Sequence, residues 1–506
     1  MNHKILVVED VPELWEQIRN YFRENHPEYE LQHASNESEA KVLLSANTFS
    51  VVVTDVDLSE GGGGAEGGFS VLAMAKQLEP DTEVIVLSAK PQADYLIRTR
   101  LGRGLSFIVR YRGPSYLDML EEEIADALNR FESALTRRMN TPIRLLHLSD
   151  LHFAADTAVD VRLWRLVDDI QRGEHLGFER LDYLVVSGDF TNQGSIEGFR
   201  NAAKFLQGLA EEFGIPEEQC LLAPGNHDVV DSPADFETRI DQNGQKVLVR
   251  SSSYGLRFKP FSDEIYQRLL NKPYPLECAS QGIATSFWKD GLQFLTLNSS
   301  WEIDQYGRNR ASVNQEALTN ALREAQTQEK EARNSGRLPA NTSLLRIAVW
   351  HHAVDGRDQL GFVPQLLNTL HINNVCICLH GDVHELRRGR FAPWERNPPL
   401  YVAGAGSFGA PGVARPEATP RLYSLLVIQR DLRSARIHTR RQDTPYSPWG
   451  GFYEWPNPNG GHVPYYDVSF SPAAPKIIDG ADIVPGLSGE KQNQSPRTGP
   501  SSRGSE

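Results

Sequence analysis

Five short polar clusters between residues 150 and 384 carry side chains that can bind metal ions. They are Asp150-Leu151-His152, Gly188-Asp189, Gly225-Asn226-His227-Asp228, His351-His352 and His380-Gly381-Asp382-Val383-His384. Carboxylate, imidazole and amide groups suit zinc, iron and manganese. One such cluster is common by chance, but five in this order predict a composite site. Two metal ions about 3.5–4 Å apart could share a ligand there and activate a water molecule.

Strand-like apolar runs must position these clusters, because most of them end where a polar cluster begins. The runs are Arg144–Leu148, Leu181–Ser187, Gln219–Ala223, Leu292–Leu297, Leu345–Val349 and Asn374–Leu379. The carboxyl ends of parallel strands lie at one edge of a sheet, so the polar side chains are expected to meet there. Three later runs are expected to complete a second sheet: Leu400–Ala403, Arg421–Gln429 and Ala435–Thr439.

A smaller acidic group lies near the N-terminus. Glu9 and Asp10 end one apolar run, and Asp55 ends another. The strand-like runs of this region are Ile5–Val8, Val51–Thr54, Val84–Leu87 and Phe107–Val109, with helical spacing between them. Such alternation predicts an α/β fold with a doubly wound parallel sheet. Acidic side chains at its carboxyl edge suit Mg²⁺ and a phosphoryl group.

Length and composition restrict the class of protein. The chain has 506 residues, which at about 100–200 residues per domain predicts more than one domain. No apolar run approaches the roughly 18 residues of a membrane span, and the N-terminus lacks a signal-peptide pattern, so we expect a cytoplasmic protein without a membrane partner. The net charge of -14 disfavours broad attraction to nucleic acid, although a local basic groove stays compatible with it.

The chain divides at changes in composition. We expect a first domain at 1–135, a linker at 136–142 that follows a helix ending near Leu135, and a second domain at 143–441. Pro142 is expected to stop the helix. A C-terminal extension at 442–470 precedes a tail at 471–506, which is rich in Ser, Pro and Gly and is expected to be disordered.

The second domain resembles the calcineurin-like metallophosphoesterase family, whose pattern is Asp-x-His, Gly-Asp, Gly-Asn-His-Asp/Glu, His and Gly-His-x-His. The resemblance implies an α/β/β/α fold with two sheets and two divalent ions, which would be Mn, Fe or Zn. It assigns Asp150, His152 and His384 to the first metal and Asn226 and His351 to the second. Asp189 would bridge the two metals. His227, oriented by Asp228, would act as the catalytic acid. Asp382 replaces a family histidine and is expected to coordinate the second metal through oxygen.

The resemblance implies hydrolysis of a phosphodiester or phosphomonoester by a hydroxide that bridges the two metals. Phe287–Ser300 and a helix near Asn314–Gln326 resemble the cyclic-nucleotide phosphodiesterase branch, so a cyclic nucleotide is a candidate substrate. Two alternatives stay open. One is an esterase acting on nucleic acid, with arginines in Arg387–Arg390 and Arg433–Arg441 lining a groove, and the other is a noncatalytic regulator with a degenerate metal site.

Residues 3–130 resemble a response-regulator receiver domain. By this resemblance Asp55 would accept phosphate from a histidine kinase, Glu9, Asp10 and the carbonyl of Asp57 would bind Mg²⁺, and Ser88 would sense the phosphoryl group. Arg110 stands where receivers have lysine, and it keeps the charge without the compact ammonium geometry. A phosphate-independent interaction module is the alternative. The fusion implies that the receiver controls the esterase, through direct contact or through a second chain in a homodimer.

Overall fold

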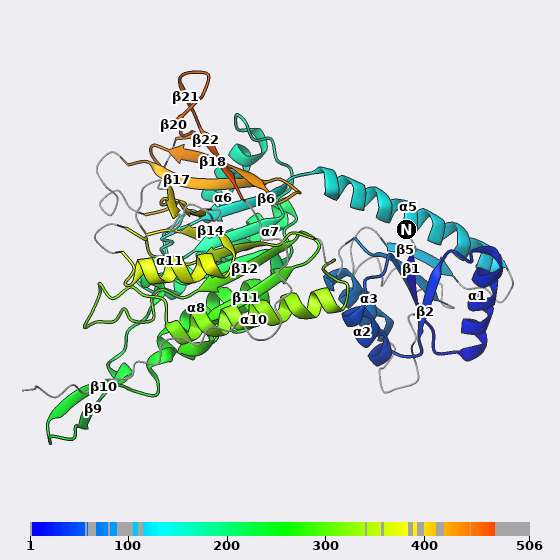
Figure 1. Ribbon diagram of the computed structural model, residues 1–506, viewed down its shortest axis with the longest axis horizontal. Helices are drawn as coiled ribbons and strands as arrows, with labels where there is room; N and C mark the ends of the chain where they lie inside the picture. The colour runs from blue at the N-terminus through cyan, green and yellow to red at the C-terminus, as the bar shows by residue number, and fades with distance from the viewer. Residues whose placement is uncertain are drawn as a thin grey trace, which may run out of the picture.

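The computed structural model describes most of the two expected domains. The described residues are 3–55, 58, 67–78, 81–88, 105–109, 115–339, 342–355, 359–382, 388–391, 399–410, 419–445 and 447–470. The predictions for Asp57, Arg110, His384 and the tail 471–506 fall outside this part of the chain. Two regions lie side by side, and the long helix α5 (Ser115–Asn140) leads from the N-terminal region into the larger one (Figure 1).

The N-terminal region is built on one parallel sheet with the strand order β2-β1-β3-β4-β5. Helices α1 and α5 cover one face and α2 and α3 the other, because their apolar residues pack into two separate cores. This confirms the doubly wound fold. The elements are β1 (Lys4–Val8), α1 (Pro12–Asn25), β2 (Glu30–Ala34), α2 (Glu37–Ala46), β3 (Val51–Asp55), α3 (Gly67–Leu78), β4 (Glu83–Ser88) and β5 (Leu105–Val109).

Two details of this region differ from the sequence-based expectation. Strand β2 was missed because its sequence, Glu-Leu-Gln-His-Ala, is mostly polar, as suits a strand at the edge of a sheet. Helix α5 continues to Asn140 instead of ending near Leu135, since nothing between these residues breaks a helix. Pro142 disfavours helical backbone at the residue before it, which explains why the helix ends where it does.

The larger region contains two sheets. The first has the order β19-β18-β17-β6-β7-β8, with β22 also paired to β18, and the second has the order β11-β12-β13-β14-β16-β15. The strands are β6 (Ile143–Leu148), β7 (Tyr183–Ser187), β8 (Cys220–Ala223), β11 (Gly282–Phe287), β12 (Leu292–Leu297), β13 (Leu345–Val349), β14 (Val375–His380), β15 (Arg388–Phe391), β16 (Leu400–Gly404), β17 (Arg421–Ile428), β18 (Ser434–Gln442), β19 (Gly450–Gly451) and β22 (Tyr465–Ser469).

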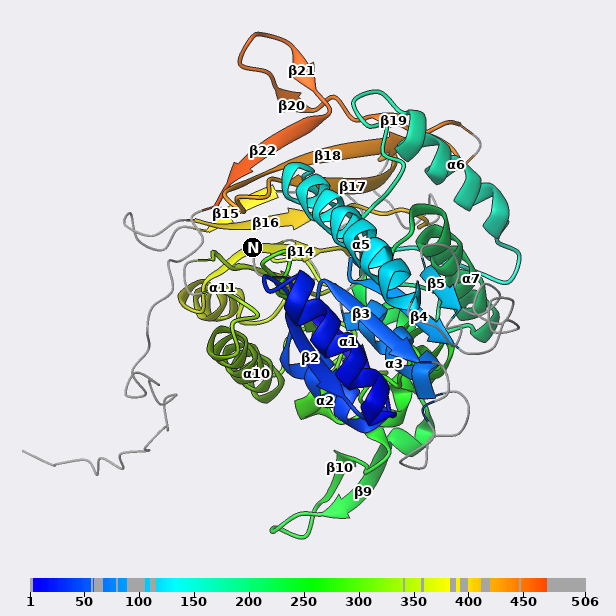
Figure 2. The same cartoon turned by 90° about the vertical axis from the view of Figure 1, so that its right-hand side faces the viewer.

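Helices cover the outer faces of the two sheets. One apolar core lies between the sheets, a second packs the first sheet against α6 (Val159–Arg172) and α7 (Ile196–Phe213), and a third packs the second sheet against α10 (Gln315–Asn334) and α11 (Val363–Ile372). The layers confirm the α/β/β/α arrangement (Figure 2). Of the three late strands, β16 does not join β17 and β18, because Leu400 and Val402 pack into the core beneath α10 and α11.

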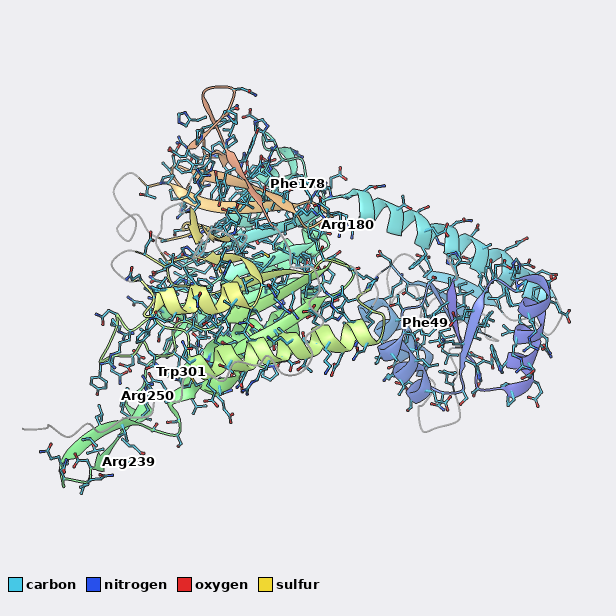
Figure 3. All side chains as sticks on the ribbon, viewed as in Figure 1. Phe49, Phe178, Arg180, Arg239, Arg250 and Trp301 are labelled. Atoms are coloured by element: carbon cyan, nitrogen blue, oxygen red, sulfur yellow. The ribbon has the colours of Figure 1, made fainter. Side chains whose placement is uncertain are left out.

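An insertion between β8 and β11 projects from the two-sheet region. The antiparallel pair β9 (Phe236–Ile240) and β10 (Lys246–Arg250) reaches outward, with Arg239 far along it and Arg250 at its base near Trp301 (Figure 3). Short elements complete the chain: η1 (Glu217–Gln219), η2 (Asn226–Asp228), η3 (Pro233–Asp235), η4 (Tyr254–Phe258), α8 (Lys259–Phe261), η5 (Ser262–Tyr266), α9 (Gln267–Leu270), η6 (Cys278–Ser280), β20 (Trp455–Pro456) and β21 (His462–Val463). Among the described helices, none is long and apolar enough to cross a membrane.

Candidate metal centre

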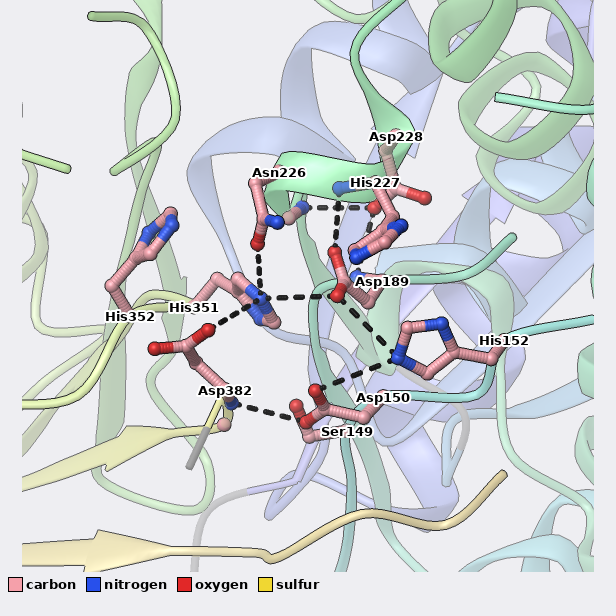
Figure 4. A network of polar contacts seen from close by, with 12 residues as sticks. Ser149, Asp150, His152, Asp189, Asn226, His227, Asp228, His351, His352 and Asp382 are labelled. Atoms are coloured by element: carbon pink, nitrogen blue, oxygen red, sulfur yellow. Dashed lines mark hydrogen bonds and ion pairs between the residues drawn. The ribbon is translucent and has the colours of Figure 1, made fainter. Parts of the chain in front are cut away.

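The polar clusters predicted to form one site meet between the two sheets. Asp150, Asp189 and Asn226 follow β6, β7 and β8 of the first sheet, and His351 and Asp382 follow β13 and β14 of the second. Figure 4 shows these side chains converging on a common centre. The sheets therefore supply the two halves of the site.

Asp189 lies at the middle of this centre. Its Oδ2 is 3.6 Å from Nε2 of His152 and 3.4 Å from Nε2 of His351, and Nε2 of His152 is also 3.9 Å from Oδ1 of Asp150. Asp189 is almost fully buried. Burial raises the pKa of its carboxyl, but the neighbouring His351 and His227 outweigh this effect and hold the pKa well below the ordinary value. Asp189 is therefore available as an ionised ligand.

His351 connects Asp189 to the second group of candidate ligands. Its Nε2 is 3.0 Å from Oδ1 of Asn226 and 3.9 Å from Oδ1 of Asp382. Its Nδ1 lies 2.7 Å from the backbone carbonyl of Ser187 and must donate there, because a carbonyl oxygen only accepts. In the neutral ring this leaves the lone pair of Nε2 facing the centre, as metal-binding histidines require.

Asp228 binds backbone N–H groups of the loops that carry the candidate ligands. Its carboxylate accepts hydrogen bonds from the N–H groups of Asp189 and Gly225 at 2.9 and 2.8 Å, and from Phe190 and Thr191 at 2.9 and 3.2 Å. Burial and the charge of Asp189 raise the pKa of Asp228 to about 8, although the hydrogen bonds from Gly225 and Thr191 oppose this shift. The carboxylate thus ties the loop after β7 to the loop after β8.

The expectation that Asp228 orients the His227 ring is wrong, because within the described part of the chain the hydrogen bonds of that carboxylate run to backbone N–H groups. The short turn η2 directs Asp228 into the interior. His227 is half-buried and stands edge-on to the ring of His152, with centroids 4.9 Å apart. Its backbone N–H donates to Oδ1 of Asp189 at 2.9 Å. His227 therefore borders the centre, with a ring nitrogen within 4.8 Å of ligand atoms of His152 and Asp189.

The backbone of the centre is held in an unusual conformation. Asp150, His152, Asp189 and Asp382 all have positive φ, at 53°, 44°, 57° and 69°. A non-glycine residue with positive φ is uncommon and costs roughly 1–2 kcal/mol. Strain of this kind persists only where surrounding structure holds it, and it clusters at functional sites.

Gly188 makes a close approach that no other residue could make. Its φ is 95°, and a Cβ there would lie 2.5 Å from Nδ1 of His351. Only glycine tolerates both the conformation and the contact. The Gly-Asp cluster is thus a packing requirement as well as a source of a ligand.

The donor set fits divalent transition metals. Three groups of potential ligands in this region have their atoms within 4.8 Å of one another: Asp150, Asp189 and His351; His152, Asp189 and His227; and His351, His352 and Asp382. Mixed imidazole and carboxylate donors of this kind suit Mn, Fe and Zn. Asp189 belongs to two of the groups, as a bridging ligand would.

His352 is the member of these groups that sequence reasoning passed over in favour of His351. It is buried, and its Nδ1 lies 2.8 Å from the hydroxyl of Ser299, which also accepts N–H bonds from His351 and His352 at 3.3 Å. The only indication in the sequence was the adjacent His-His pair. The orienting Ser187 and Ser299 could not be recognised, because they lie far from the histidines along the chain.

The receiver-like region brings its acidic residues together as well. Ligand atoms of Glu9, Asp10 and Asp55 lie within 4.8 Å of one another at the carboxyl edge of the sheet. Glu9 and Asp55 are buried, and Oε1 of Glu9 accepts the N–H of Val11 at 3.2 Å. Ser88 ends the neighbouring strand β4, which places its backbone at the same edge. The donor set, all oxygen, suits Mg²⁺.

Comparison with known proteins assigns each region to a family. Residues 143–386 match the family model of calcineurin-like phosphoesterases, and residues 5–109 match that of response regulator receiver domains. The chain thus carries a receiver domain followed by a calcineurin-like phosphoesterase domain. Both resemblances seen in the motifs are confirmed, while the narrower cyclic-nucleotide branch finds no support.

One curated relative is an uncharacterized metallophosphoesterase-like protein, YydB of Bacillus subtilis (strain 168), with 23% identity over 232 residues. The match covers 42% of this chain and 43% of that protein, so the chain spans less than half the length of this relative. Solved structures with a likeness include a Francisella receiver domain, of response regulator 1452, at 22% identity and TM-score 0.22, covering 26% of this chain and 98% of that one. Another is TrrA of Thermotoga maritima, solved in complex with Mg(2+)-BeF, at 24% identity and TM-score 0.20, covering 25% and 99%.

Proposed function

We propose that the chain hydrolyses a phosphodiester or phosphomonoester at a centre of two divalent ions, Mn, Fe or Zn. The observation that carries this proposal is the position of Asp189, whose carboxylate faces ring nitrogens of both His152 and His351. The ligands would be Asp150, His152, Asp189, Asn226, His351, Asp382 and His384.

The side chains around the centre have distinct tasks in this proposal. Two bound ions would neutralise the phosphoryl oxygens and lower the pKa of the attacking water from near 15.7 towards about 7. His227, which is half-buried at the border of the centre, would give a proton to the leaving oxygen. Asp228 is a positioning residue, since it holds the backbone that carries Asp189.

Hydrolysis of bis(p-nitrophenyl) phosphate, p-nitrophenyl phosphate and cyclic AMP tests this proposal. We expect turnover with added Mn²⁺, loss of turnover on chelation, and a fall of at least about a hundredfold in Asp189→Asn, beyond the 10–100-fold typical of residues that only orient a ligand. Asp168→Asn, an exposed carboxylate of α6, is the matched control. The preferred compound separates diesterase from monoesterase. Equal rates in Asp189→Asn and the native chain would refute the metal centre.

We further propose that phosphorylation of Asp55 in the receiver regulates the esterase through a direct contact between the domains. Nζ of Lys289, in the turn between β11 and β12, lies 3.7 Å from Oδ2 of Asp81, just before β4 of the receiver. Burial, together with the charge of Lys76 in the receiver, lowers the pKa of Lys289 to about 8, against the opposing effect of Asp290. The charges of the two domains therefore act on one another.

The same turn connects to the metal-binding strands. Oδ2 of Asp290 accepts the hydroxyl of Tyr183 at 2.5 Å, and Tyr183 begins β7, whose far end leads to Asp189. Oδ1 of Asp290 accepts from Arg430 at 2.6 Å, and Arg430 also donates to the carbonyl of Thr141, directly after α5. A movement of the receiver would thus reach Tyr183 at the start of β7 by two routes. One runs through Lys289 and the adjacent Asp290, and the other through Thr141, Arg430 and Asp290.

Beryllofluoride, which imitates a phosphoryl group on aspartate, tests the regulation. If the contact transmits the signal, beryllofluoride with Mg²⁺ should change kcat/KM by about fivefold or more, the lower end of usual coupling free energies. The change should vanish in Asp55→Asn and shrink in Lys289→Ala, while the exposed Lys272→Ala keeps it. A full response in Lys289→Ala would reject this route, and no response in the native chain would favour the phosphate-independent module. A histidine kinase donor, a homodimer and a cytoplasmic location stay predictions.

A further inference from the structure

His352 borders the metal centre but has no task in the function proposed above. One of its ring nitrogens lies within 4.8 Å of ligand atoms of both His351 and Asp382. Figure 4 shows the residue at the edge of the centre, next to these two side chains. The rings of His351 and His352 stand edge to face, with centroids 4.9 Å apart. Two adjacent residues thus bring two imidazoles to the same centre.

Ser299 determines which nitrogen of His352 carries a proton. Its hydroxyl oxygen accepts the backbone N–H groups of His351 and His352, both at 3.3 Å, and lies 2.8 Å from Nδ1 of His352. A hydroxyl group has two lone pairs and one proton. Since the two N–H groups occupy the lone pairs, the hydroxyl donates its proton to Nδ1, which must accept it. The other nitrogen, Nε2, therefore carries the proton of the neutral ring.

The two adjacent histidines consequently present opposite groups through Nε2. Nδ1 of His351 donates to the carbonyl of Ser187, which leaves a lone pair on Nε2. Nδ1 of His352 accepts from Ser299, which leaves an N–H group on Nε2. A metal ligand needs a lone pair, whereas an N–H group binds only an acceptor. His351 is therefore suited to a metal ion, and His352 is suited to an oxygen atom.

The surroundings of His352 hold its ring in place. Its backbone carbonyl accepts Nε1–H of Trp350 at 2.7 Å, and Trp350 is fully buried. Ser299, also fully buried, follows β12, and its carbonyl accepts the N–H of Ser312 at 3.0 Å. Within the described part of the chain, no residue accepts a hydrogen bond from Nε2 of His352. A donor fixed in this way loses little conformational freedom when it binds an acceptor.

We propose that His352 is a substrate-binding residue whose Nε2–H donates a hydrogen bond to an oxygen of the phosphoryl group, and that it is a ligand of neither metal. This inference rests on the proposed esterase function, because it requires the phosphoryl group to bind at the metal centre. A phosphoryl group is an anion with several acceptor oxygens. A fixed donor beside the metals therefore adds to its binding without occupying a coordination position.

Calorimetric titration with inorganic phosphate tests this role without turnover. The native chain, His352→Phe and His438→Phe are loaded with Mn²⁺, and the bound Mn²⁺ per chain is measured. We expect the native Mn²⁺ content in all three, and phosphate binding at least about tenfold weaker in His352→Phe alone, near the lower end of what a hydrogen bond to a charged group contributes. His438 is the matched control, because it is also buried but lies on β18 against Phe178 and Tyr465. His352→Gln, whose side-chain NH₂ can replace Nε2–H, should recover part of the affinity.

The protonated nitrogen can be measured in the native chain, which keeps the proposal testable if His352→Phe does not fold. Long-range ¹H–¹⁵N NMR spectra of Zn²⁺-loaded protein labelled with ¹⁵N-histidine separate protonated from unprotonated ring nitrogens, and His352→Gln assigns the signals. We expect a proton on Nε2 of His352. The proposal is overturned by a proton on Nδ1 alone, by the loss of one Mn²⁺ per chain in either His352 variant, or by equal phosphate affinity in His352→Phe and His438→Phe. A lack of turnover with the expected binding results would instead refute the esterase and leave the phosphate contact intact.

Discussion

The two acidic sites of the chain are both built at the carboxyl ends of parallel strands, yet they are held differently. In the esterase domain four candidate ligands have positive φ, and Asp228 binds four backbone N–H groups beneath them. In the receiver Glu9, Asp10 and Asp55 are not among the residues with positive φ. The candidate ligands of the esterase domain thus lie on a strained and hydrogen-bonded backbone, whereas the three acidic residues of the receiver lie on backbone of ordinary φ.

This difference follows from what each site has to bind. Two adjacent metal ions require six or seven donors in fixed positions, so the loops that carry them must be rigid. A single Mg²⁺ keeps several waters and accepts one or two carboxylates. Supporting residues should therefore matter as much as ligands in the esterase domain, and much less in the receiver.

Asp228→Asn should have the largest effect of the changes that sharpen this contrast. The side-chain amide of asparagine would replace one carboxylate oxygen with an NH₂ group. The buried backbone N–H groups that donate to that oxygen, such as those of Asp189 and Gly225, would then have no acceptor. We expect the free energy of unfolding to fall by about 3–5 kcal/mol and metal affinity by about 10–100-fold. Urea unfolding and Mn²⁺ titration measure the two effects. A change as small as that of the exposed Asp160→Asn would show that the carboxylate does not support the loops.

Gly188→Ala and Gly177→Ala form a matched pair for the close approach beneath His351. Both glycines have positive φ, at 95° and 88°, but only at Gly188 would a Cβ meet the imidazole, while nothing lies within 4 Å at Gly177. We expect Gly177→Ala to cost about 1–2 kcal/mol from strain alone, and Gly188→Ala to cost about 2 kcal/mol more through overpacking. Thermal unfolding with and without Mn²⁺ measures the difference. Equal losses of stability in the two variants would mean that the His351 ring can move away from the added Cβ without an energetic cost.

The sequence predicted this framework well wherever polar motifs end buried strands. Asp150, Asp189 and His351 each follow a short apolar run, and the runs before them are fully or almost fully buried as β6, β7 and β13. Where apolar pattern was absent the prediction failed, as for the polar edge strand β2. Hydrophobic periodicity reports burial, so an edge strand gives little of it.

Interactions across the fold could not be predicted. His227 and Asp228 are adjacent, which suggested a paired side chain, but the turn η2 sends the carboxylate to a loop about 38 residues away. The carbonyl of Ser187 that orients His351 is separated from it by 164 positions. The Asp228 contacts depend on how two strands of one sheet align, and the His351 contact depends on how the two sheets face each other. No local sequence pattern encodes either arrangement.

Asp55→Asn tests the receiver site, where the charge of the carboxylates should matter more for ion binding than hydrogen bonds to the backbone do. Removing one of three close carboxylates should weaken Mg²⁺ binding roughly tenfold, or about 1.4 kcal/mol, with little change in stability without the ion. Calorimetric titration with Mg²⁺ in the Asp189→Asn background limits the contribution of the esterase centre. Asp126→Asn, exposed on α5, is the control. A large loss of stability without Mg²⁺ would show that the receiver site also relies on internal support.

The pH dependence of the receiver should show the smallest effect, through His26 at the end of α1. Burial lowers the pKa of His26, but hydrogen bonds to Glu121 at 2.6 Å and Glu28 at 3.0 Å outweigh this and raise it above the ordinary value near 6.5. A raised folded pKa means that the stabilisation is complete below about pH 6.5 and is lost as pH rises through the folded pKa. His26 joins α1 to α5, the helix that enters the esterase domain, so this contact should loosen in the same interval.

Histidine resonances followed by NMR between pH 5.5 and 8.5 measure the shift directly, with the exposed His462 as the internal reference. The thermal midpoint of the native chain should approach that of His26→Asn as pH rises, because the ion pairs to Glu121 and Glu28 disappear with the proton. Parallel profiles for the two proteins would show that these glutamates do not favour the charged ring. In that case the α1–α5 contact would rest on apolar packing, such as Phe22 against Ile124, and the receiver would depend less on charge than its metal-binding edge does.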